Sequence, residues 1–315
     1  MLEHGGRIGE AARRWNIPRA DWLDLSTGIS PWPYPLPAPP AEVWRRLPEE
    51  EDGLESAARD YYGADHLLML PGSQAAIQWL PRLMPAGRVA MPVPLYNEHP
   101  AAWRAAGHAL VEWSAPSDYA VLCNPNNPTG VRFTRDELIE RARGLRLLVV
   151  DEAFIDAEPD ESLAHGDTEN PRHSIIVLRS LGKFFGLAGA RVGCALGAPA
   201  LLDRLATALG PWSIAHPARW AARQALADRG WQAAQRSRLV DASRRLADRL
   251  TCLGTPVGCA LFQTVAAPRA AELYEALAKR GILVRRFDTP SALRFGLPGD
   301  EVQWRRLENS LKEIA

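Results

Sequence analysis

The sequence predicts an α/β fold, with a large domain built on a mostly parallel sheet and a smaller α+β domain after it. Short apolar stretches alternate with helical stretches between residues 52 and 197, a pattern typical of parallel strands joined by helices. Several apolar stretches end directly in polar or glycine-rich segments, as strands do at the ligand-binding edge of such a sheet. After Gly197 the alternation gives way to longer helical stretches and a few separate strands.

Residues 1–40 are interpreted as an N-terminal arm. A helical stretch over 8–15 and a short alternating strand over 22–26 come first. The segment 31–40 is rich in proline, so we expect an extended chain with no core of its own. Its tryptophan and tyrosine favour docking on a surface, either of the same subunit or of a partner.

Residues 41–205 are predicted to form the large domain. Glycine ends its first helix, and a threonine with a glutamate three residues later begins its last one. The expected helices cover residues 54–62, 75–84, 94–106 and a stretch that begins at 134. The expected strands cover residues 67–70, 88–91, 110–113, 119–123, 146–150 and 174–178.

Residues 206–315 are predicted to form the small C-terminal domain. Leucines recur on one stripe of its longest helical stretch, which indicates packing against a core. Around and within this domain, the expected helices cover residues 201–209, 218–228, 232–250, 270–280 and 301–314. The expected strands or edge segments cover residues 261–266, 282–285 and 292–297.

The composition narrows the class of protein. Lysine plus arginine equals aspartate plus glutamate, 37 each, so neither a nucleic-acid nor an acidic-membrane partner is expected. No stretch reaches the roughly 18 apolar residues of a membrane span, and residues 1–7 lack the apolar core of a signal peptide. The cysteines have no CxxC spacing; Cys123 and Cys194 lie in apolar runs and are expected as buried free thiols. These observations favour a cytoplasmic protein, and we expect no metal site.

The glycine-rich stretch 180–193 follows the last apolar strand of the large domain and contains Lys183, one of three lysines in the chain. A lysine that attacks a carbonyl must lose its proton near neutral pH, which requires burial or nearby cations. Ser180 and Arg191 could bind an anion beside it. This combination suggests pyridoxal 5′-phosphate, although taken alone the stretch could also be a solvated loop.

Polar groups elsewhere fall just beyond other predicted strands. The turn Gly72-Ser73-Gln74 joins a strand to a helix, a geometry that aims backbone N–H groups at an anion. A plain helix cap by Ser73 is the alternative. Asn127 lies in a tight turn, and Asp151 directly follows a strand, where we expect it half-buried with a cationic partner. A surface acid or a helix cap is the alternative for Asp151.

Pyridoxal 5′-phosphate requires a lysine for its aldehyde, a carboxylate at its pyridine nitrogen, a donor to its phenolic oxygen, a phosphate cradle and a flat group over its ring. The chain has one candidate for each, in that order: Lys183, Asp151, Asn127, the turn Gly72-Ser73-Gln74 with Ser180 and Arg191, and Tyr96.

Three motifs carry a family resemblance: Asn-Pro-x-Asn-Pro-Thr-Gly at 124–130, Asp-Glu-Ala-Phe at 151–154, and Ser-x-x-Lys with Gly-x-x-Gly-x-Arg-x-Gly at 180–193. In these the chain resembles fold-type I pyridoxal-phosphate enzymes of the class I/II aminotransferase group. The resemblance covers nearly the whole chain. It implies the PLP-dependent transferase-like fold and a homodimer with sites near the interface.

The resemblance also implies roles for single residues. Lys183 and Asp151 would be catalytic, with Lys183 at the cofactor aldehyde and Asp151 at the pyridine nitrogen. Asn127 would bind the phenolic oxygen, and Arg191 the phosphate. Arg294 would hold the substrate carboxylate; without the resemblance it would be interpreted as an exposed strand residue.

Two branches of the group are similar to this chain: histidinol-phosphate aminotransferases and the threonine-phosphate decarboxylases of cobalamin biosynthesis. The His4-Gly5-Gly6 segment and the stretch around Gly28 resemble the decarboxylase branch, and Phe154, where many aminotransferases have tyrosine, favours it too. The branch implies decarboxylation of O-phospho-L-threonine to (R)-1-amino-2-propanol O-2-phosphate. The alternatives are a histidinol-phosphate-type aminotransferase and a non-catalytic pyridoxal-phosphate-binding partner in the same pathway.

We expect Arg294, Asn127, His4 and Gly28 to bind this small phosphorylated substrate, with basic groups such as His4, Arg7 and Arg285 at its phosphate. Two further positions stay open. Leu47 stands where relatives have a tyrosine that reaches the neighbouring subunit's cofactor phosphate. His99 lies one helical turn after Tyr96, where it could reach Asp151 or face solvent.

Overall fold

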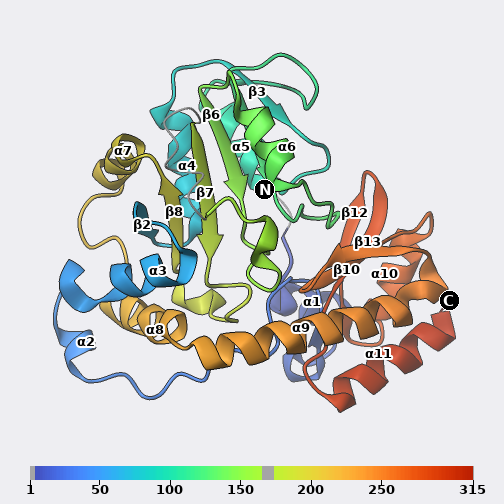
Figure 1. The fold of residues 1–315 in the computed structure, drawn as a ribbon. Helices are drawn as coiled ribbons and strands as arrows, with labels where there is room; N and C mark the ends of the chain where they lie inside the picture. The colour runs from blue at the N-terminus through green and yellow to red at the C-terminus, as the bar shows by residue number, and fades with distance from the viewer. Residues whose placement is uncertain (1–3, 165–173, 315) are drawn as a thin grey trace.

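The computed structural model describes residues 4–164 and 174–314. Its large domain contains a seven-stranded sheet in the order β2-β8-β7-β6-β5-β3-β4 (Figure 1). The strands are β2 (Leu67–Leu70), β3 (Arg88–Met91), β4 (Ala109–Glu112), β5 (Tyr119–Cys123), β6 (Leu147–Asp151), β7 (Ile175–Ser180) and β8 (Gly193–Gly197). β3 to β7 run parallel, and β8 is antiparallel to both its neighbours, which confirms the mostly parallel sheet.

Successive side chains of the central strands point to opposite faces, and each face has its own helical layer. Val149 belongs to one apolar cluster and Val150 to the other. The Val149 face is covered by α4 (Ser73–Leu83), α5 (Glu98–Ala105) and α7 (Pro199–Leu209). The Val150 face is covered by α3 (Leu54–Tyr62), α6 (Arg135–Ala142) and α8 (His216–Ala227). Both faces are buried, so these strands are apolar throughout.

A second sheet of four antiparallel strands forms the core of the small domain, in the order β12-β13-β10-β9. Its strands are β9 (Pro256–Cys259), β10 (Phe262–Ala266), β12 (Arg285–Asp288) and β13 (Ser291–Gly296), and its helices are α10 (Ala270–Ala278) and α11 (Glu301–Ile314). The helix α9 (Arg229–Leu250) runs from the large domain to this sheet (Figure 1). None of the described helices, α9 included, is both long and apolar enough to cross a membrane.

The N-terminal arm docks on the same chain. It contains α1 (Ile8–Trp15), β1 (Leu23–Asp24) and, just beyond it, α2 (Glu42–Arg45), and β1 pairs in parallel with β11 (Ile282–Leu283). Further on, Trp32 Nε1 donates to Gly299 O at 2.7 Å, and the Tyr34 ring lies edge-on to Trp231. The docking predicted from the arm's aromatic residues is therefore intramolecular for this part of the arm.

Most predicted elements agree with the structure within a few residues, but two differ. The single edge segment expected over 282–285 is two strands, because β11 pairs with the arm and β12 pairs with β13. The helix expected from Pro94 begins only at Glu98. The proposed boundary near residue 205 stays a prediction; α8, which follows it, packs on α3 of the large domain.

A buried ion cluster lies behind the ends of β6 and β7. Arg179 Nη1 donates to Glu152 Oε2 at 2.9 Å, and its Nη2 pairs with Asp156. Ser162 Oγ donates to the same Glu152 oxygen at 2.6 Å, and Tyr61 donates to Asp156 at 3.0 Å. Burial raises the pKa of the Glu152 carboxyl, and this effect outweighs the opposite effect of Arg179. The cluster ties the segment after β6 to β7.

We predict that Arg179→Met lowers the midpoint of urea unfolding strongly, because it leaves two acidic side chains buried without their cation. The loss of a buried partner costs about 3–5 kcal/mol. Circular dichroism during urea titration measures it. Arg143→Met, which removes an exposed arginine paired with Glu140, serves as the control and should change little. An Arg179→Met midpoint equal to that of the wild type would contradict the role of the cluster.

Candidate active site

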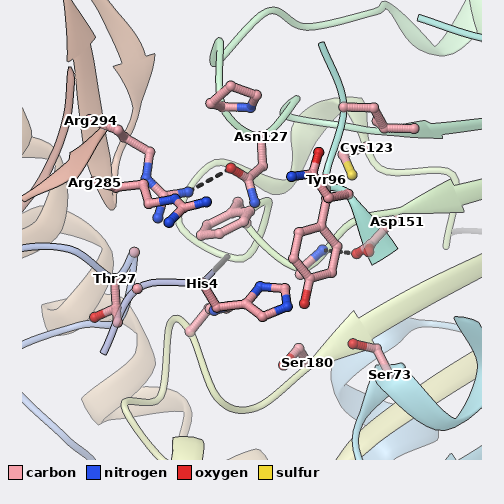
Figure 2. A pocket seen from close by; sticks show the side chains of 18 of the residues that line it. His4, Thr27, Ser73, Tyr96, Cys123, Asn127, Asp151, Ser180, Arg285 and Arg294 are labelled. Atoms are coloured by element: carbon pink, nitrogen blue, oxygen red, sulfur yellow. Dashed lines mark hydrogen bonds between the residues drawn. The ribbon is translucent and has the colours of Figure 1, made fainter. Parts of the chain in front are cut away.

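A cavity of about 250 Å³ lies where the ends of β5, β6 and β7 meet the N-terminal arm and the small-domain strands β12 and β13 (Figure 2). Most site residues predicted from the sequence line it; the exceptions are Gly72, which adjoins it through Arg191, and Arg7, which lines a neighbouring cavity. These lining residues are His4, Gly28, Ser73, Gln74, Tyr96, Asn127, Asp151, Ser180, Lys183, Arg191 and Arg294. One cavity thus gathers residues from nearly the whole length of the chain.

Lys183 lies on the turn that follows β7, and the turn is anchored from two sides. Ser30 N donates to Lys183 O at 3.0 Å, and Gln235 Nε2 bonds both Ser30 Oγ and Phe184 O. Burial, with Arg294 and Arg191 nearby, lowers the pKa of Lys183 to about 8, although Asp151 opposes the shift. A lysine in this state supplies a neutral amine near physiological pH.

Asp151 is only 4% exposed, so it is more buried than the half-buried position expected from the sequence. Its Oδ1 accepts from Ala153 N, and its Oδ2 lies 3.0 Å from Nε2 of the buried His99. His99 therefore faces Asp151 and not solvent. Asp151 and His99 come together because side chains alternate between the two faces of a strand. Asp151 points to the same sheet face as Val149, and α5, which carries His99, covers that face.

The end of the cavity where we expect an anion to bind forms around Gly72 and Arg191. Gly72 has a φ of 78°, and a Cβ on it would lie 2.8 Å from Arg191 Nη2. Arg191 itself has a left-handed φ of 53°, and its Nη1 donates to Ala188 O at 3.1 Å. Position 72 therefore requires glycine, because its φ is positive and because a side chain there would clash with Arg191. The Arg191 guanidinium lies against the start of α4, where an anion is favoured.

Ser73 and Gln74 begin α4. Gly72 is the N-cap and makes no side-chain capping bond, so the alternative of a plain cap by Ser73 is wrong. Gln74 Nε2 donates to Glu98 Oε2 at 2.7 Å, so its side chain is held by Glu98. Ser73 and Ser180 lie near each other at the cavity wall (Figure 2), which Arg191 also lines.

Arg294 and Asn127 meet across the domain junction. Arg294 Nη1 donates to Asn127 Oδ1 at 2.5 Å, and its Nη2 donates to Ser26 O at 3.0 Å (Figure 2). Arg294 is 7% exposed, so the interpretation as an exposed strand residue is wrong. Burial and the neighbouring Arg285 lower the pKa of Arg294 to about 10, which leaves it charged near neutral pH. Its buried Nε has no hydrogen-bond partner in the described structure.

Gly28 lies directly against Phe154, because a Cβ at this position would be 2.6 Å from Phe154 Cε1. Phe154 packs edge-on to Phe262, and Lys183 Nζ lies 5.3 Å from its ring centroid. Phe154 therefore places an apolar ring beside the lysine, where a tyrosine would add a hydroxyl donor.

Tyr96 lies between His4 and His99, with 6.1 Å between its ring centroid and each of theirs. Burial, Glu98 and Asp151 raise the pKa of the Tyr96 phenol, so it stays protonated. Its ring forms a wall of the cavity (Figure 2).

The sequence interpretation missed several lining residues, including Ser26, Thr27 and Cys123. Cys123 is the last residue of β5, so it could have been predicted from its position at the end of a strand. Arg285 lines the cavity as expected, whereas Arg7 lines a smaller neighbouring one. Glu98 had no signal in the sequence, because its partners are far away along the chain.

His99, Cys123 and Asp151 bring possible metal-ligand atoms within 4.8 Å of one another. Burial and Asp151 raise the pKa of the Cys123 thiol well above its ordinary value, so the thiol stays protonated. His99 and Asp151 already bond each other. This group therefore supports the carboxylate and is a poor metal site; the absence of a metal remains a prediction. Cys123 and Cys194 are buried free thiols, as expected.

The donor set fits pyridoxal 5′-phosphate. One cavity is lined by a lysine of lowered pKa, a buried carboxylate bonded to histidine, an amide and a tyrosine ring. It is also lined by an arginine and two serines, of which Ser73 begins a helix. Fold and site together define a fold-type I pyridoxal-phosphate enzyme.

The family model "Aminotransferase class I and II" matches residues 48–311, and the chain belongs to this pyridoxal-phosphate-dependent family. The chain is 53% identical over 325 residues to the threonine-phosphate decarboxylase of Pseudomonas aeruginosa, covering 99% of this chain and 97% of that one. It is 42% identical to the threonine-phosphate decarboxylase of Sinorhizobium sp, covering 99% and 98%. The histidinol-phosphate aminotransferase of Sinorhizobium meliloti, solved with pyridoxal-5′-phosphate, superposes with a TM-score of 0.84 at 18% identity, covering 100% and 99%. The last similarity confirms the fold.

We predict that Lys183 in cofactor-free protein reacts with acetic anhydride with a midpoint near pH 8. The neutral amine is the reactive form, and at this pKa it makes up about a tenth of the population at pH 7 and half at pH 8. Peptide mass spectrometry follows the labelling, with the exposed Lys279 and Lys312 as internal references. A Lys183 profile that tracks those two lysines would rule out the lowered pKa.

We predict that Gly72→Ala raises the dissociation constant of pyridoxal 5′-phosphate roughly tenfold, because the new methyl displaces Arg191 and weakens a charge-assisted bond. Equilibrium dialysis measures the constant. Gly144→Ala is the matched control: Gly144 has the same φ of 78° but no neighbour within 4 Å. An equal rise of the dissociation constant in the two variants would show that backbone strain, and not displacement of Arg191, weakens cofactor binding.

Proposed function

We propose that this protein is a pyridoxal-phosphate-dependent decarboxylase that converts O-phospho-L-threonine to (R)-1-amino-2-propanol O-2-phosphate in cobalamin biosynthesis. The observation that carries the proposal is 53% identity, over nearly the full chain, to a curated threonine-phosphate decarboxylase. The site geometry supports it, because cofactor-binding groups and cationic substrate-binding groups share one cavity.

When bound, pyridoxal 5′-phosphate supplies an electron-accepting ring for the electron pair released when a bond at the substrate α-carbon breaks. Asp151, backed by His99, would hold a proton at the ring nitrogen. Asn127 would bind the phenolic oxygen. Ser73, Ser180 and Arg191 would hold the phosphate at the start of α4.

The substrate would be held at two ends. Arg294 would bind its carboxylate, since a guanidinium matches a carboxylate with two parallel bonds. Arg285, the cross-strand neighbour of Arg294, lines the cavity together with Thr27 and His4, and these three would bind the remote phosphate (Figure 2). Fixing both ends of the substrate sets the rotation about the bond between its α-carbon and its nitrogen. This rotation decides which of the other bonds at the α-carbon breaks.

In the proposed reaction the bond between the α-carbon and the carboxyl carbon breaks, and CO₂ leaves. Lys183, whose pKa is about 8, would donate a proton to the α-carbon in its place. Phe154 contributes an apolar wall beside the lysine and Gly28, where it would exclude water.

We also propose a cytoplasmic homodimer without a nucleic-acid or membrane partner. Equal numbers of acidic and basic residues support the absence of a nucleic-acid partner. The apolar side chains of Trp44, Leu47 and Trp212 are 60–68% exposed, which supports a second copy covering them. Leu47 has no hydroxyl, so this position would give the partner's cofactor phosphate no hydrogen bond.

We predict that the cofactor-loaded protein releases CO₂ from O-phospho-L-threonine and does not transaminate histidinol phosphate with 2-oxoglutarate. Lys183→Ala should abolish CO₂ release, whereas Lys279→Ala, at an exposed lysine, should not change it. A coupled CO₂ assay measures both. Transamination without CO₂ release would favour the aminotransferase alternative. Cofactor absorbance without turnover would favour the non-catalytic one.

A further inference from the structure

Glu98, the first residue of α5, joins two parts of the cavity wall that the proposed function assigns to two different phosphates. Its Oε1 lies 2.8 Å from His4 Nε2. Its Oε2 accepts from Gln74 Nε2 at 2.7 Å and from Gln78 Nε2 at 3.2 Å. One carboxylate thus connects the N-terminal arm to the first turns of α4.

The bonding of Glu98 fixes the orientation of the His4 ring. An ionised carboxylate only accepts hydrogen bonds, so His4 Nε2 carries the proton in this pair. Nδ1 is then the ring nitrogen left for a ligand, and the described structure gives it no hydrogen-bond partner. His4 is 34% exposed in its side chain and lines the cavity, so it is not a core histidine.

The backbone holds the same segment from the other side. Gly6 N donates to Ser26 Oγ at 2.7 Å, and a Cβ on Gly5 would lie 2.3 Å from Ser26 O. Ser26 O also accepts from Arg294. The two glycines therefore let the start of the arm pack closely against the segment after β1, whose Ser26 carbonyl holds Arg294. Glu98 fixes the end of the arm that carries His4.

We propose that Glu98 is a positioning residue that holds the His4 imidazole with Nδ1 toward the cavity, and so sets the affinity of the site for the phosphate group of the substrate. An imidazolium at His4 would donate from Nδ1 to a phosphate oxygen, and the Glu98 carboxylate would balance its charge. The inference deepens the proposed function and rests on it for the identity of the substrate.

The location of Glu98 explains why a carboxylate is suited to this task. It lies at the N-terminus of α5, where negative charge is stabilised, and its side chain is only 16% exposed. The next residue, His99, bonds Asp151. The first turn of α5 therefore supports the cofactor carboxylate with one residue and the substrate-phosphate side with the residue before it.

The test uses cofactor-loaded Glu98→Gln, His4→Ala and the double variant, with Glu10→Gln as the charge-matched control. Glu10 pairs with Arg7 on the same arm and makes no bond to His4. Calorimetric titration with inorganic phosphate gives a dissociation constant that does not depend on turnover. Initial rates with O-phospho-L-threonine give KM and kcat separately.

We expect Glu98→Gln to weaken phosphate binding and raise KM by roughly tenfold, the loss of about one charge-assisted bond, with kcat within about twofold. His4→Ala should do the same. The double variant should be no weaker than the more affected single variant, because Glu98 acts through His4. Glu10→Gln should match the wild type, and cofactor absorbance should persist throughout.

Unchanged phosphate affinity in Glu98→Gln, or additive losses in the double variant, would overturn the proposal. Loss of cofactor absorbance in Glu98→Gln would also overturn it, because Glu98 would then serve the cofactor cradle through Gln74. A wild-type protein that releases no CO₂ would refute the decarboxylase function, whereas the phosphate titration would still decide the role of Glu98.

Discussion

The alternation of side chains along β6 and β7 determines where this site can form, because neighbouring residues point to opposite faces of the sheet. Asp151 and Ser180 line the cavity, on the face that α4 and α5 cover. Glu152 and Arg179, one residue away along each strand, pair behind the sheet. The proposed cofactor-binding residues and the Arg179–Glu152 ion pair are neighbours in sequence and therefore lie on opposite faces of the sheet. A shift of the strand register by one residue would turn the ion-pair residues toward the cavity and the proposed cofactor-binding residues away from it.

The cavity is held together by side chains that each have more than one task. Gln235 on α9 bonds both the arm and the turn that carries Lys183, so the domain-linking helix also positions the lysine. Arg294 is held by Asn127 of the large domain and by Ser26 of the arm. The residues proposed to bind cofactor and substrate are therefore oriented by hydrogen bonds that cross between chain segments.

Much of this could be predicted from the sequence, and the exceptions have a common cause. Periodicity located the helices and strands, and position at a strand end identified Asp151 and Lys183. His4, which Glu98 contacts, lies 94 residues away in the sequence, so no local pattern reveals the pair. Arg179 could have been recognised, because a charge inside an apolar strand requires a buried partner. Without the family resemblance Arg294 would have been interpreted as exposed, which is wrong because Asn127 of the large domain and Ser26 of the arm contact it.

The parallel pairing of β1 with β11 joins part of the N-terminal arm to the C-terminal part of the chain. The first and last parts of the chain, which carry His4, Gly28, Arg285 and Arg294, thereby form one continuous wall, and the middle of the chain supplies the cofactor groups. The groups proposed for substrate and for cofactor thus come mainly from different parts of the sequence, and Glu98 and Asn127 connect the two parts. A change of substrate on this scaffold would therefore have to alter both terminal parts together and keep the contacts of His4 with Glu98 and of Arg294 with Asn127.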